Sequence, residues 1–279
     1  MKMRKLIAFL MISCLFACKQ SQDPDPQTNA NNPTPNTPNT PKEWKLVWSD
    51  EFDYTGLPDS RKWSYDVGGN GWGNRESQYY TNARLENARV ENGKLIIEAR
   101  RERFLGNDYT SARLITKGKG DWTYGRIEVR AKIPRGTGTW AAIWMLASTD
   151  PLRWPDDGEI DIMEHVGFDP NVIHGTIHTK LYNGMLGTQR GDKVRINTAQ
   201  DEFHNYIIDW DINRIEWYVD GNKYFTYGNI NSNKDTYPFM SNFHLLLNIA
   251  IGGAWGGQRG IDDTIFPQKM EIEYVRVYQ

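Results

Sequence analysis

The chain has 279 residues, and its 33 Lys and Arg against 35 Asp and Glu give a formal net charge of −2 at pH 7. This balance, without a basic stripe, argues against nucleic acid as a partner. Aromatic residues make up 13% of the chain, and such flat apolar rings are what a carbohydrate-binding protein needs beyond those in its core.

Residues 1–17 are predicted to be an export signal. A basic start precedes an apolar run over residues 6–17 that is too short to span a membrane. The run ends in LFAC, with Ala17 before Cys18, and this resembles the lipobox of bacterial lipoproteins. The resemblance implies lipidation of Cys18, and ordinary signal cleavage nearby is the alternative. We therefore expect an exported protein held by a lipid anchor on a bacterial membrane, at the outer membrane or cell surface.

Residues 18–41 are predicted to be a disordered tether behind the lipidated cysteine. After Cys18 the segment is rich in Pro, Asn and Thr and has no large apolar side chain. Such a segment cannot offset its ordering entropy by burial. Because Cys14 would leave with the signal, Cys18 would be the only cysteine of the mature chain. An intrachain disulfide and a cysteine-based metal site are then excluded.

Residues 42–279 are predicted to be one all-β domain. The stretch RIEVRAKI alternates strictly between polar and apolar residues, which is typical of a half-buried strand. NYIIDWD and RIEWYVDGNKYFTY read as consecutive strands, with Asp220 and Gly221 as a hairpin turn. FHLLLNIAIGG is mostly apolar and fits a strand covered on both faces. This many strands in one domain predict two packed sheets.

Three acids, Glu159, Asp161 and Glu164, lie in the stretch DGEIDIMEHVG. In a regular strand Glu159 and Asp161 share one face and Glu164 points to the other. One extra residue in a β-bulge would bring Glu164 back to the first face. Only then could Glu159 and Glu164 flank a glycosidic bond, with Asp161 modulating their charges. The alternative is an exposed, solvated acidic strand, but the apolar residues between the acids favour a site.

At these residues the chain resembles glycoside hydrolase family 16. EIDIMEHVG is similar to the bulged E-x-D-x-x-E signature of the family, and GTWAAIWML to its Trp-bearing strand. GWGNRESQYYT, YGRIEVRAKIP, HGTIHT, LLLNIAIGGAWGG and YVRVYQ resemble the laminarinase-like branch, the endo-β-1,3(4)-glucanases. The resemblance implies a β-jelly roll sandwich of two packed antiparallel sheets with a concave substrate groove. It also implies retention of anomeric configuration, with Glu159 as nucleophile, Glu164 as acid/base and Asp161 as the assisting carboxylate. The bulge is expected at Met163 or a neighbour.

Six further residues match sugar-binding positions of the family. They are Asn74, Arg75, Trp140, Trp144, His178 and Trp255. Each also has a structural alternative: a plain turn for the first two, core packing for the tryptophans, and a structural role for the histidine. Glu76 is not predicted to bind sugar, because it could pair with the neighbouring Arg75.

Many members of the family hold a structural calcium ion on the convex side. The matching positions are the carbonyls of Glu51 and Gly93 and the side chain of Glu273, where the family usually has Asp. Glu273 has the strand parity of Val275 and Val277, which is unusual for a charge unless it is paired or binds an ion. The resemblance therefore allows a calcium ion without requiring one.

The leading hypothesis is a monomeric, membrane-anchored, retaining endo-glycoside hydrolase that needs no cofactor for catalysis. Its expected substrates are β-1,3- or mixed-linkage β-1,3-1,4-glucans. A galactan hydrolase of the agar or carrageenan type is an alternative, because loops change such specificity. A second alternative is a non-catalytic glycan-binding surface lipoprotein, which would need the tryptophans but not both Glu159 and Glu164.

Overall fold

The strands of the protein follow the apolar alternation of its sequence. The computed structural model describes residues 43–279, and this part contains strands and two short 3₁₀ helices. The predicted signal, tether and lipidated Cys18 (residues 1–17 and 18–41) lie outside the described residues. Within the described part, none of the helices has the length and apolar character needed to cross a membrane.

Two sheets carry the strands of the described part. The ten strands of the larger sheet are β1 (Leu46–Asp50), β3 (Gln78–Tyr80), β4 (Ala88–Glu91), β5 (Lys94–Phe104), β6 (Asn107–Ser111), β9 (Gly125–Lys132), β14 (His204–Trp210), β15 (Arg214–Val219), β16 (Asn222–Gly228) and β18 (Gln268–Tyr278). The eight strands of the smaller sheet are β2 (Ser64–Tyr65), β7 (Arg113–Ile115), β8 (Asp121–Trp122), β10 (Thr139–Ala147), β11 (Glu159–Val166), β12 (Val172–His178), β13 (Arg190–Arg195) and β17 (Phe243–Ile251). The helices are η1 (Ile230–Ser232) and η2 (Asp263–Ile265).

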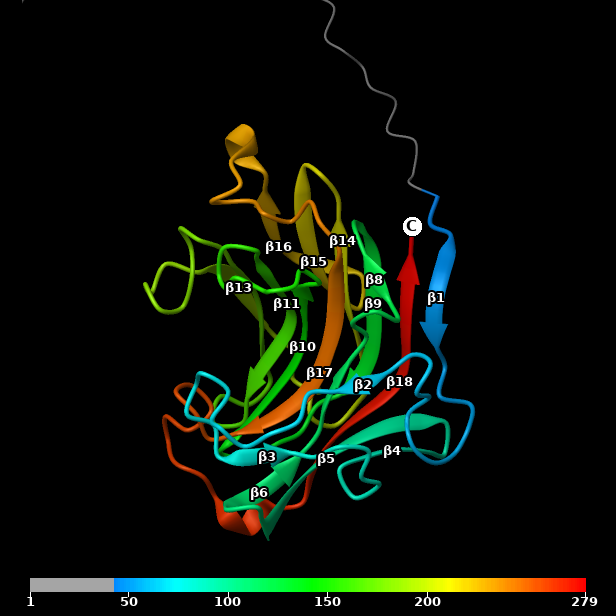
Figure 1. Cartoon of the computed structure of the whole chain (residues 1–279), viewed down its shortest axis with the longest axis vertical. Coiled ribbons are helices and arrows are strands. Elements are labelled where there is room, and N and C mark those ends of the chain that lie inside the picture. Colours follow the sequence, from blue (N-terminus) through cyan, green and yellow to red (C-terminus); the bar gives the residue numbers. More distant parts are fainter. Residues whose placement is uncertain (1–42) are drawn as a thin grey trace, which may run out of the picture. The chain divides into compact units, whose positions relative to one another are not determined.

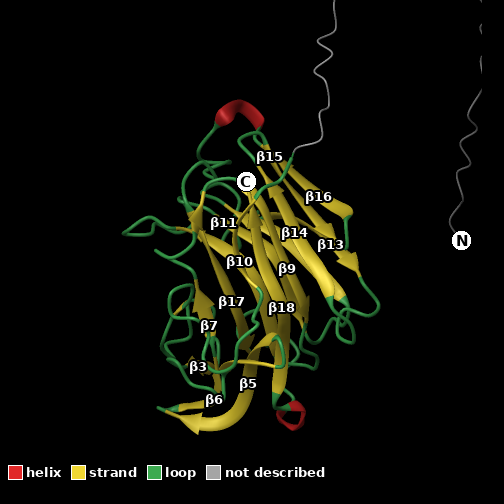
Figure 2. Cartoon of the chain, turned by 90° about the vertical axis from the view of Figure 1, so that its right-hand side faces the viewer, coloured by secondary structure: helices red, strands yellow, loops and turns green. Residues whose placement is uncertain are grey.

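The sheets lie face to face as a sandwich (Figure 1, Figure 2). The larger sheet runs β16-β15-β14-β9-β18-β5-β6-β3, with β1 beside β18 and β4 beside β5. The smaller runs β13-β12-β11-β10-β17-β7-β2, with β8 beside β17. The predicted all-β sandwich is therefore confirmed. One detail differs: β3 and β6 pair in parallel, whereas the other ladders of the described strands are antiparallel.

The predicted strands form where their patterns placed them. In β9 every second side chain is buried, as strict alternation requires. β15 and β16 form the predicted hairpin, in which Asp220 and Gly221 both have positive φ, 50° and 77°. Two consecutive positive φ values are what a type I′ turn needs. β17 is buried along its whole length, which confirms that both of its faces are covered.

The core lies between the two sheets and is large enough to hold the fold without a disulfide. β17 contributes Phe243, Leu245, Leu247, Ile249 and Ile251 to it, all with no exposed surface. Each such side chain contributes about 1.5–3 kcal/mol when it is fully buried. The opposite face of β10, β11 and β17 is consequently free to carry polar and aromatic side chains.

A register shift in β18 corrects the prediction about the parity of Glu273. Ile272 and Tyr274 pair with consecutive residues of β9, so Glu273 between them is one extra residue. The alternation restarts after it, and Glu273 is partly exposed while Val275 and Val277 are buried. The expectation that Glu273 shares their face was wrong, because a bulge changes parity without leaving a mark in the sequence pattern.

Two of the three residues named for calcium have side chains in ion pairs. Glu273 Oε2 accepts a hydrogen bond from Arg130 Nε at 2.6 Å. The side chain of Glu51 forms an ion pair with Arg276 at 2.8 Å. The guanidinium of Arg130 compensates the charge of Glu273, which disfavours this carboxylate as a calcium ligand in this arrangement. A calcium ion on the carbonyls of Glu51 and Gly93 stays a prediction.

Candidate active site

The bulge that the three acids require is present in β11. On the β10 side, Met163 pairs with Ile143 and Asp161 with Trp144, which leaves Ile162 without a partner. On the β12 side, Ile162 and Met163 together oppose the single residue Gly175. The extra residue is therefore Ile162, a neighbour of Met163, as the resemblance implied.

The bulge directs two consecutive side chains into the core. Ile162 and Met163 are 2% and 0% exposed and both belong to the core between the sheets. The alternation restarts after them, so Glu164 returns to the face of Glu159 and Asp161. All three acids therefore lie on one face of the smaller sheet.

A tryptophan of the opposite sheet holds the bulge. Trp217 of β15 is fully buried, and its Nε1 donates a hydrogen bond of 2.8 Å to the backbone carbonyl of Asp161. Gly175 makes room for it, because a Cβ at this position would lie 2.6 Å from Trp217 Cδ1 and 2.6 Å from the hydroxyl of Tyr224. Glycine opposite the bulge and tryptophan behind it thus supply the space and the hydrogen bond that the irregular backbone needs.

Burial favours the neutral form of the carboxyl groups of Asp161 and Glu164. Asp161 and Glu164 are only 2% and 9% exposed. Burial, with the charge of Glu159 and a hydrogen bond to it, raises the pKa of Asp161 well above its ordinary value. Burial, followed by the charge of Asp161, likewise raises the pKa of Glu164. Glu164 therefore keeps its proton to a higher pH than an ordinary glutamate, which suits a proton donor.

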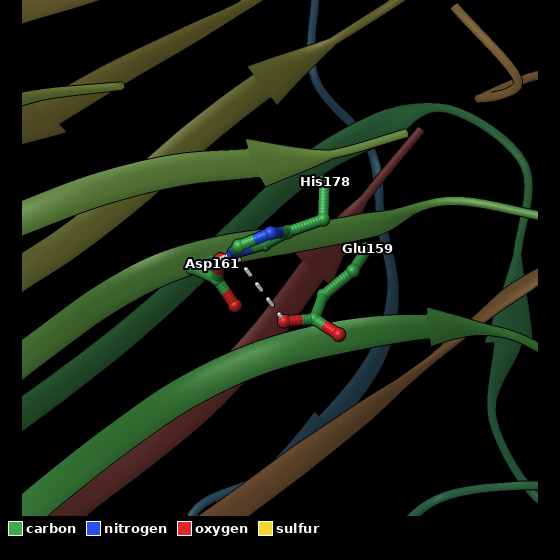
Figure 3. A group of neighbouring side chains, drawn as sticks. All are labelled: Glu159, Asp161 and His178. Atoms are coloured by element: carbon green, nitrogen blue, oxygen red, sulfur yellow. Dashed lines mark ion pairs between the residues drawn. The ribbon is translucent and has the colours of Figure 1, made fainter. Parts of the chain in front are cut away.

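His178 joins the acids on this face. Its Nδ1 accepts a hydrogen bond of 3.1 Å from the backbone N–H of Gly184, so in the neutral ring the proton is on Nε2. Nε2 lies 3.4 Å from Asp161 Oδ2 and 3.8 Å from Glu159 Oε1 (Figure 3). Of the two alternatives for His178, this geometry favours the site over a role in the core.

Glu159, Asp161 and His178 are also close enough for a metal ion. Each offers one atom within 4.8 Å of the others, and no other group of three His, Cys, Asp or Glu in residues 43–279 does so. Glu159 accepts hydrogen bonds from its neighbours, however, and Asp161 retains a proton through its raised pKa. The hydrogen bond between Asp161 and Glu159 thus accounts for the close approach of these two carboxyls.

Trp154 is a site residue that the sequence analysis missed. Its Nε1 donates a hydrogen bond of 2.6 Å to Glu159 Oε2, and its ring centre lies 5.9 Å from that of His178. It sits in the stretch WPDDG, before β11, and is 38% exposed. The only sequence signal was a tryptophan five residues before an acid, outside any predicted strand.

We expect Trp154→Phe to lower kcat on a cleaved glycan by about 10- to 100-fold, because a hydrogen bond to a charged group contributes about 1.5–3 kcal/mol. The ring is kept and only the N–H that reaches Glu159 is lost. Trp255→Phe is the matched control, since no hydrogen bond of its N–H occurs among residues 43–279. Steady-state kinetics should show a change in kcat for Trp154→Phe only. Equal kcat values would mean that Trp154 is a binding surface alone.

The two tryptophans of β10 flank the acids. Trp140 Nε1 donates to Glu164 Oε1 at 3.1 Å, and Trp144 Nε1 donates to Asn248 Oδ1 at 2.7 Å. Both rings are partly exposed, and Trp144 carries the guanidinium of Arg113 over its ring at 4.6 Å. The alternative of burial between the sheets does not hold for either of them.

Trp255 lies beside Trp140 at one end of this face. Its ring meets the rings of Trp140 and His174 edge to face, with centres 5.5 Å and 4.9 Å apart. Burial lowers the pKa of His174 to about 4, so this ring stays neutral. Trp255 is partly exposed rather than buried, which leaves part of its ring open to a ligand.

The loop of residues 71–77 brings Asn74 and Arg75 to the surface. Both are exposed, and Arg75 adopts φ 60°, a left-handed conformation. The pairing of Glu76 with Arg75 considered from sequence is absent from the ion pairs of the described residues. The Glu76 carboxylate instead accepts hydrogen bonds from Asn74 and from residues of β3.

Comparison with known proteins agrees with this geometry. Residues 75–276 match the model of the glycosyl hydrolases family 16. A beta-glucanase of Rhodothermus marinus is 58% identical over 244 residues, which are 85% of either chain. The solved laminarinase from the same organism has a TM-score of 0.83 and 57% identity and covers 85% of this chain and 98% of that one. A variant of SCLam, a non-specific endo-beta-1,3(4)-glucanase co-crystallised with 1,3-beta-D-cellotriosyl-glucose, has a TM-score of 0.83 and 50% identity and covers 86% and 96%.

Proposed function

The chain belongs to glycosyl hydrolases family 16, and we propose that it cleaves β-1,3- or mixed-linkage β-1,3-1,4-glucans as a retaining endo-glucanase. The observation that carries this function is the bulge at Ile162, because it puts Glu159 and Glu164 on one face of the sheet. Two carboxyls on one face are the minimum that glycosidic hydrolysis needs. Enzymes of this family need no cofactor for catalysis, and the site has both groups in its own chain.

In the first step, a Glu159 carboxylate oxygen attacks the anomeric carbon and forms the glycosyl-enzyme bond. Glu164 gives its proton to the glycosidic oxygen, so the aglycone leaves as an alcohol. The raised pKa of Glu164 keeps this proton available. The rate should fall as the pH rises through that pKa, because the acid is then lost.

In the second step, Glu164 is ionised and takes a proton from a water molecule, whose oxygen attacks the anomeric carbon. The bond to Glu159 breaks, and the configuration of the substrate is restored. Asp161 and Trp154 support Glu159 through hydrogen bonds. These hydrogen bonds stabilise the Glu159 carboxylate that is released when the glycosyl-enzyme bond breaks.

The aromatic residues around the acids serve as walls for the sugar units. Trp140 and Trp255 form one such wall, while Trp154 and His178 lie at the Glu159 end. Sugar rings present C–H groups that pack on aromatic faces. Asn74 and Arg75, both exposed, supply polar groups for sugar hydroxyls at the margin of the site.

Reducing ends released in parallel from laminarin, barley mixed-linkage glucan and agarose test this function. We expect release from laminarin or barley glucan, with a rapid fall in polymer length that marks endo cleavage. Release from agarose alone would favour the galactan alternative. Binding to these polymers without any release would favour a non-catalytic glycan-binding protein.

We propose that the enzyme is anchored to the membrane through a lipid on Cys18, which lies outside the described residues. The support is the LFAC stretch at the end of the apolar run. Cys18→Ser should move the protein from the membrane fraction to the soluble fraction, where it should run as a monomer. Cys14→Ser is the control and should not change the distribution. Membrane retention of Cys18→Ser would contradict the anchor.

A further inference from the structure

The carboxylate of Glu76 is an acceptor for three side chains. Its Oε1 accepts from Asn74 Nδ2 at 3.2 Å, and its Oε2 accepts from Gln78 Nε2 at 2.6 Å and from the Tyr80 hydroxyl at 3.4 Å. Gln78 and Tyr80 are buried, and Glu76 is partly buried beside them. Burial raises the pKa of Glu76, although these hydrogen bonds oppose the change. A titratable side chain that is partly buried and hydrogen-bonded in this way is a candidate for a functional role.

A backbone N–H of β17 fixes the orientation of the Gln78 side-chain amide. Its Oε1 accepts a hydrogen bond of 2.7 Å from the backbone N–H of Ile251, at the end of β17. Its Nε2 must therefore point to Glu76. As a result, Glu76 Oε2 is committed to Gln78 and Tyr80, and only Oε1 is left for Asn74.

The same residues are tied to the candidate active site. The Tyr80 hydroxyl accepts from Asn248 Nδ2 at 3.0 Å, and Asn248 Oδ1 accepts from Trp144 Nε1 at 2.7 Å. The backbone carbonyl of Asn74 accepts from the N–H of Ala254 at 2.8 Å. These hydrogen bonds fix the position of the Asn74 loop relative to the smaller sheet, which carries the acids.

Glu76 also determines which end of the Asn74 amide faces outward. A carboxylate can only accept, so it takes the Nδ2 end of Asn74. Asn74 is exposed, and its Oδ1 has no hydrogen-bond partner among residues 43–279. The surface therefore presents a hydrogen-bond acceptor here.

We propose that Glu76 is a positioning residue that turns Oδ1 of Asn74 toward the substrate, where it accepts a hydrogen bond from a glucan hydroxyl. This inference rests on the proposed glucanase function and adds a specificity element to the same site. A purely structural role for Glu76, as a tie between the loop and β3, is the alternative.

Glu76→Gln distinguishes the positioning role from the structural role. It replaces one acceptor oxygen by an NH2 donor and keeps the shape of the side chain. The introduced glutamine must give its oxygen to Gln78 and Tyr80, so its Nε2 faces Asn74. Asn74 should then rotate, offer its Oδ1 to the glutamine and present Nδ2 outward. We expect KM for laminarin to rise about tenfold, the factor that corresponds to about 1.4 kcal/mol. The loss should reside in KM rather than in kcat.

Asn74→Asp should have a similar effect in the wild-type background, because the new carboxylate meets the carboxylate of Glu76. The decisive variant is the double substitution Glu76→Gln with Asn74→Asp. Here the introduced carboxylate accepts from the introduced amide and again presents an oxygen outward. KM should return to within about threefold of wild type. If Glu76 only held the loop to β3, the second substitution would not be expected to restore KM.

Glu202→Gln is the matched control, since Glu202 is exposed and its carboxylate has no hydrogen bond or ion pair among residues 43–279. Its KM should equal that of wild type. Additive losses in the double variant, or a wild-type KM for either single variant, would overturn the role of Glu76. If Glu76→Gln does not fold, the exposed substitution Asn74→Asp still decides, because a wild-type KM would refute the proposal. A wild-type chain inactive on laminarin and barley glucan would instead overturn the proposed function, and this inference with it.

Discussion

Glu164→Ala is expected to lose about 10²–10⁴-fold of its turnover on glucan, the usual contribution of a general acid–base group. An aryl glycoside with a very acidic leaving group needs little protonation, so its first step should survive. The second step should then stall, because nothing activates the water. Added azide needs no such activation and should attack the glycosyl-enzyme, giving a β-glycosyl azide.

Glu159→Ala is expected to fail differently. No side chain is left to form the glycosyl-enzyme bond, so turnover should be lost on every substrate. Azide can attack only directly, from the side that Glu159 vacates, and the product would be the α-anomer. NMR of the azide products distinguishes the two outcomes. Glu202→Ala, at an exposed position, should behave as wild type, and the reverse pattern of anomers would mean that the two roles are exchanged.

Trp217→Phe is expected to lower both stability and turnover, although Trp217 lies in the core and does not reach the substrate. The substitution leaves the buried carbonyl of Asp161 without its hydrogen bond and opens a small cavity. Together these losses should reduce the free energy of unfolding by about 2–4 kcal/mol. The freed carbonyl should also let the bulge relax, which displaces Glu164 relative to Glu159. Misplacement of a reacting group by 1 Å can cost about 10²-fold in rate.

Trp210→Phe is the control for this experiment. Trp210 is equally buried, and its Nε1 donates to the backbone carbonyl of Phe239 at 3.1 Å. It therefore loses the same kind of bond and volume, but away from the bulge. Both variants should melt earlier, and only Trp217→Phe should lose kcat at a temperature where both are folded. Equal kcat values would show that the bulge keeps its shape without Trp217.

The sequence pattern predicted the regular parts of the fold and the resemblance predicted one irregular part. Strict alternation located β9, and the turn residues Asp220 and Gly221 located the hairpin. The bulge in β11 was expected only from the family signature, since alternation alone put Glu164 on the wrong face. The bulge at Glu273 had no such signature, and the parity argument failed there for the same physical reason.

The site residues that were not predicted lie where the local backbone conformation directs the side chain, and a periodic sequence pattern does not describe that conformation. Trp154 reaches Glu159 from a loop, and no periodicity describes a loop. Glu76 was not predicted because it could pair with its neighbour Arg75, but its carboxylate accepts hydrogen bonds from Asn74, Gln78 and Tyr80 instead. No sequence pattern marks Trp217, because its partner is a backbone carbonyl on the other sheet.

The three acids lie on β11, and Trp140, which donates to Glu164, lies on β10; both strands are in the interior of the smaller sheet rather than at its edge. Interior strands open to solvent only when most of the molecule does, whereas loops and edges open locally and often. Loss of activity on heating should therefore follow the melting of the whole domain, with little inactivation below it. The temperature at which catalysis stops and the temperature at which the domain unfolds should then be nearly the same.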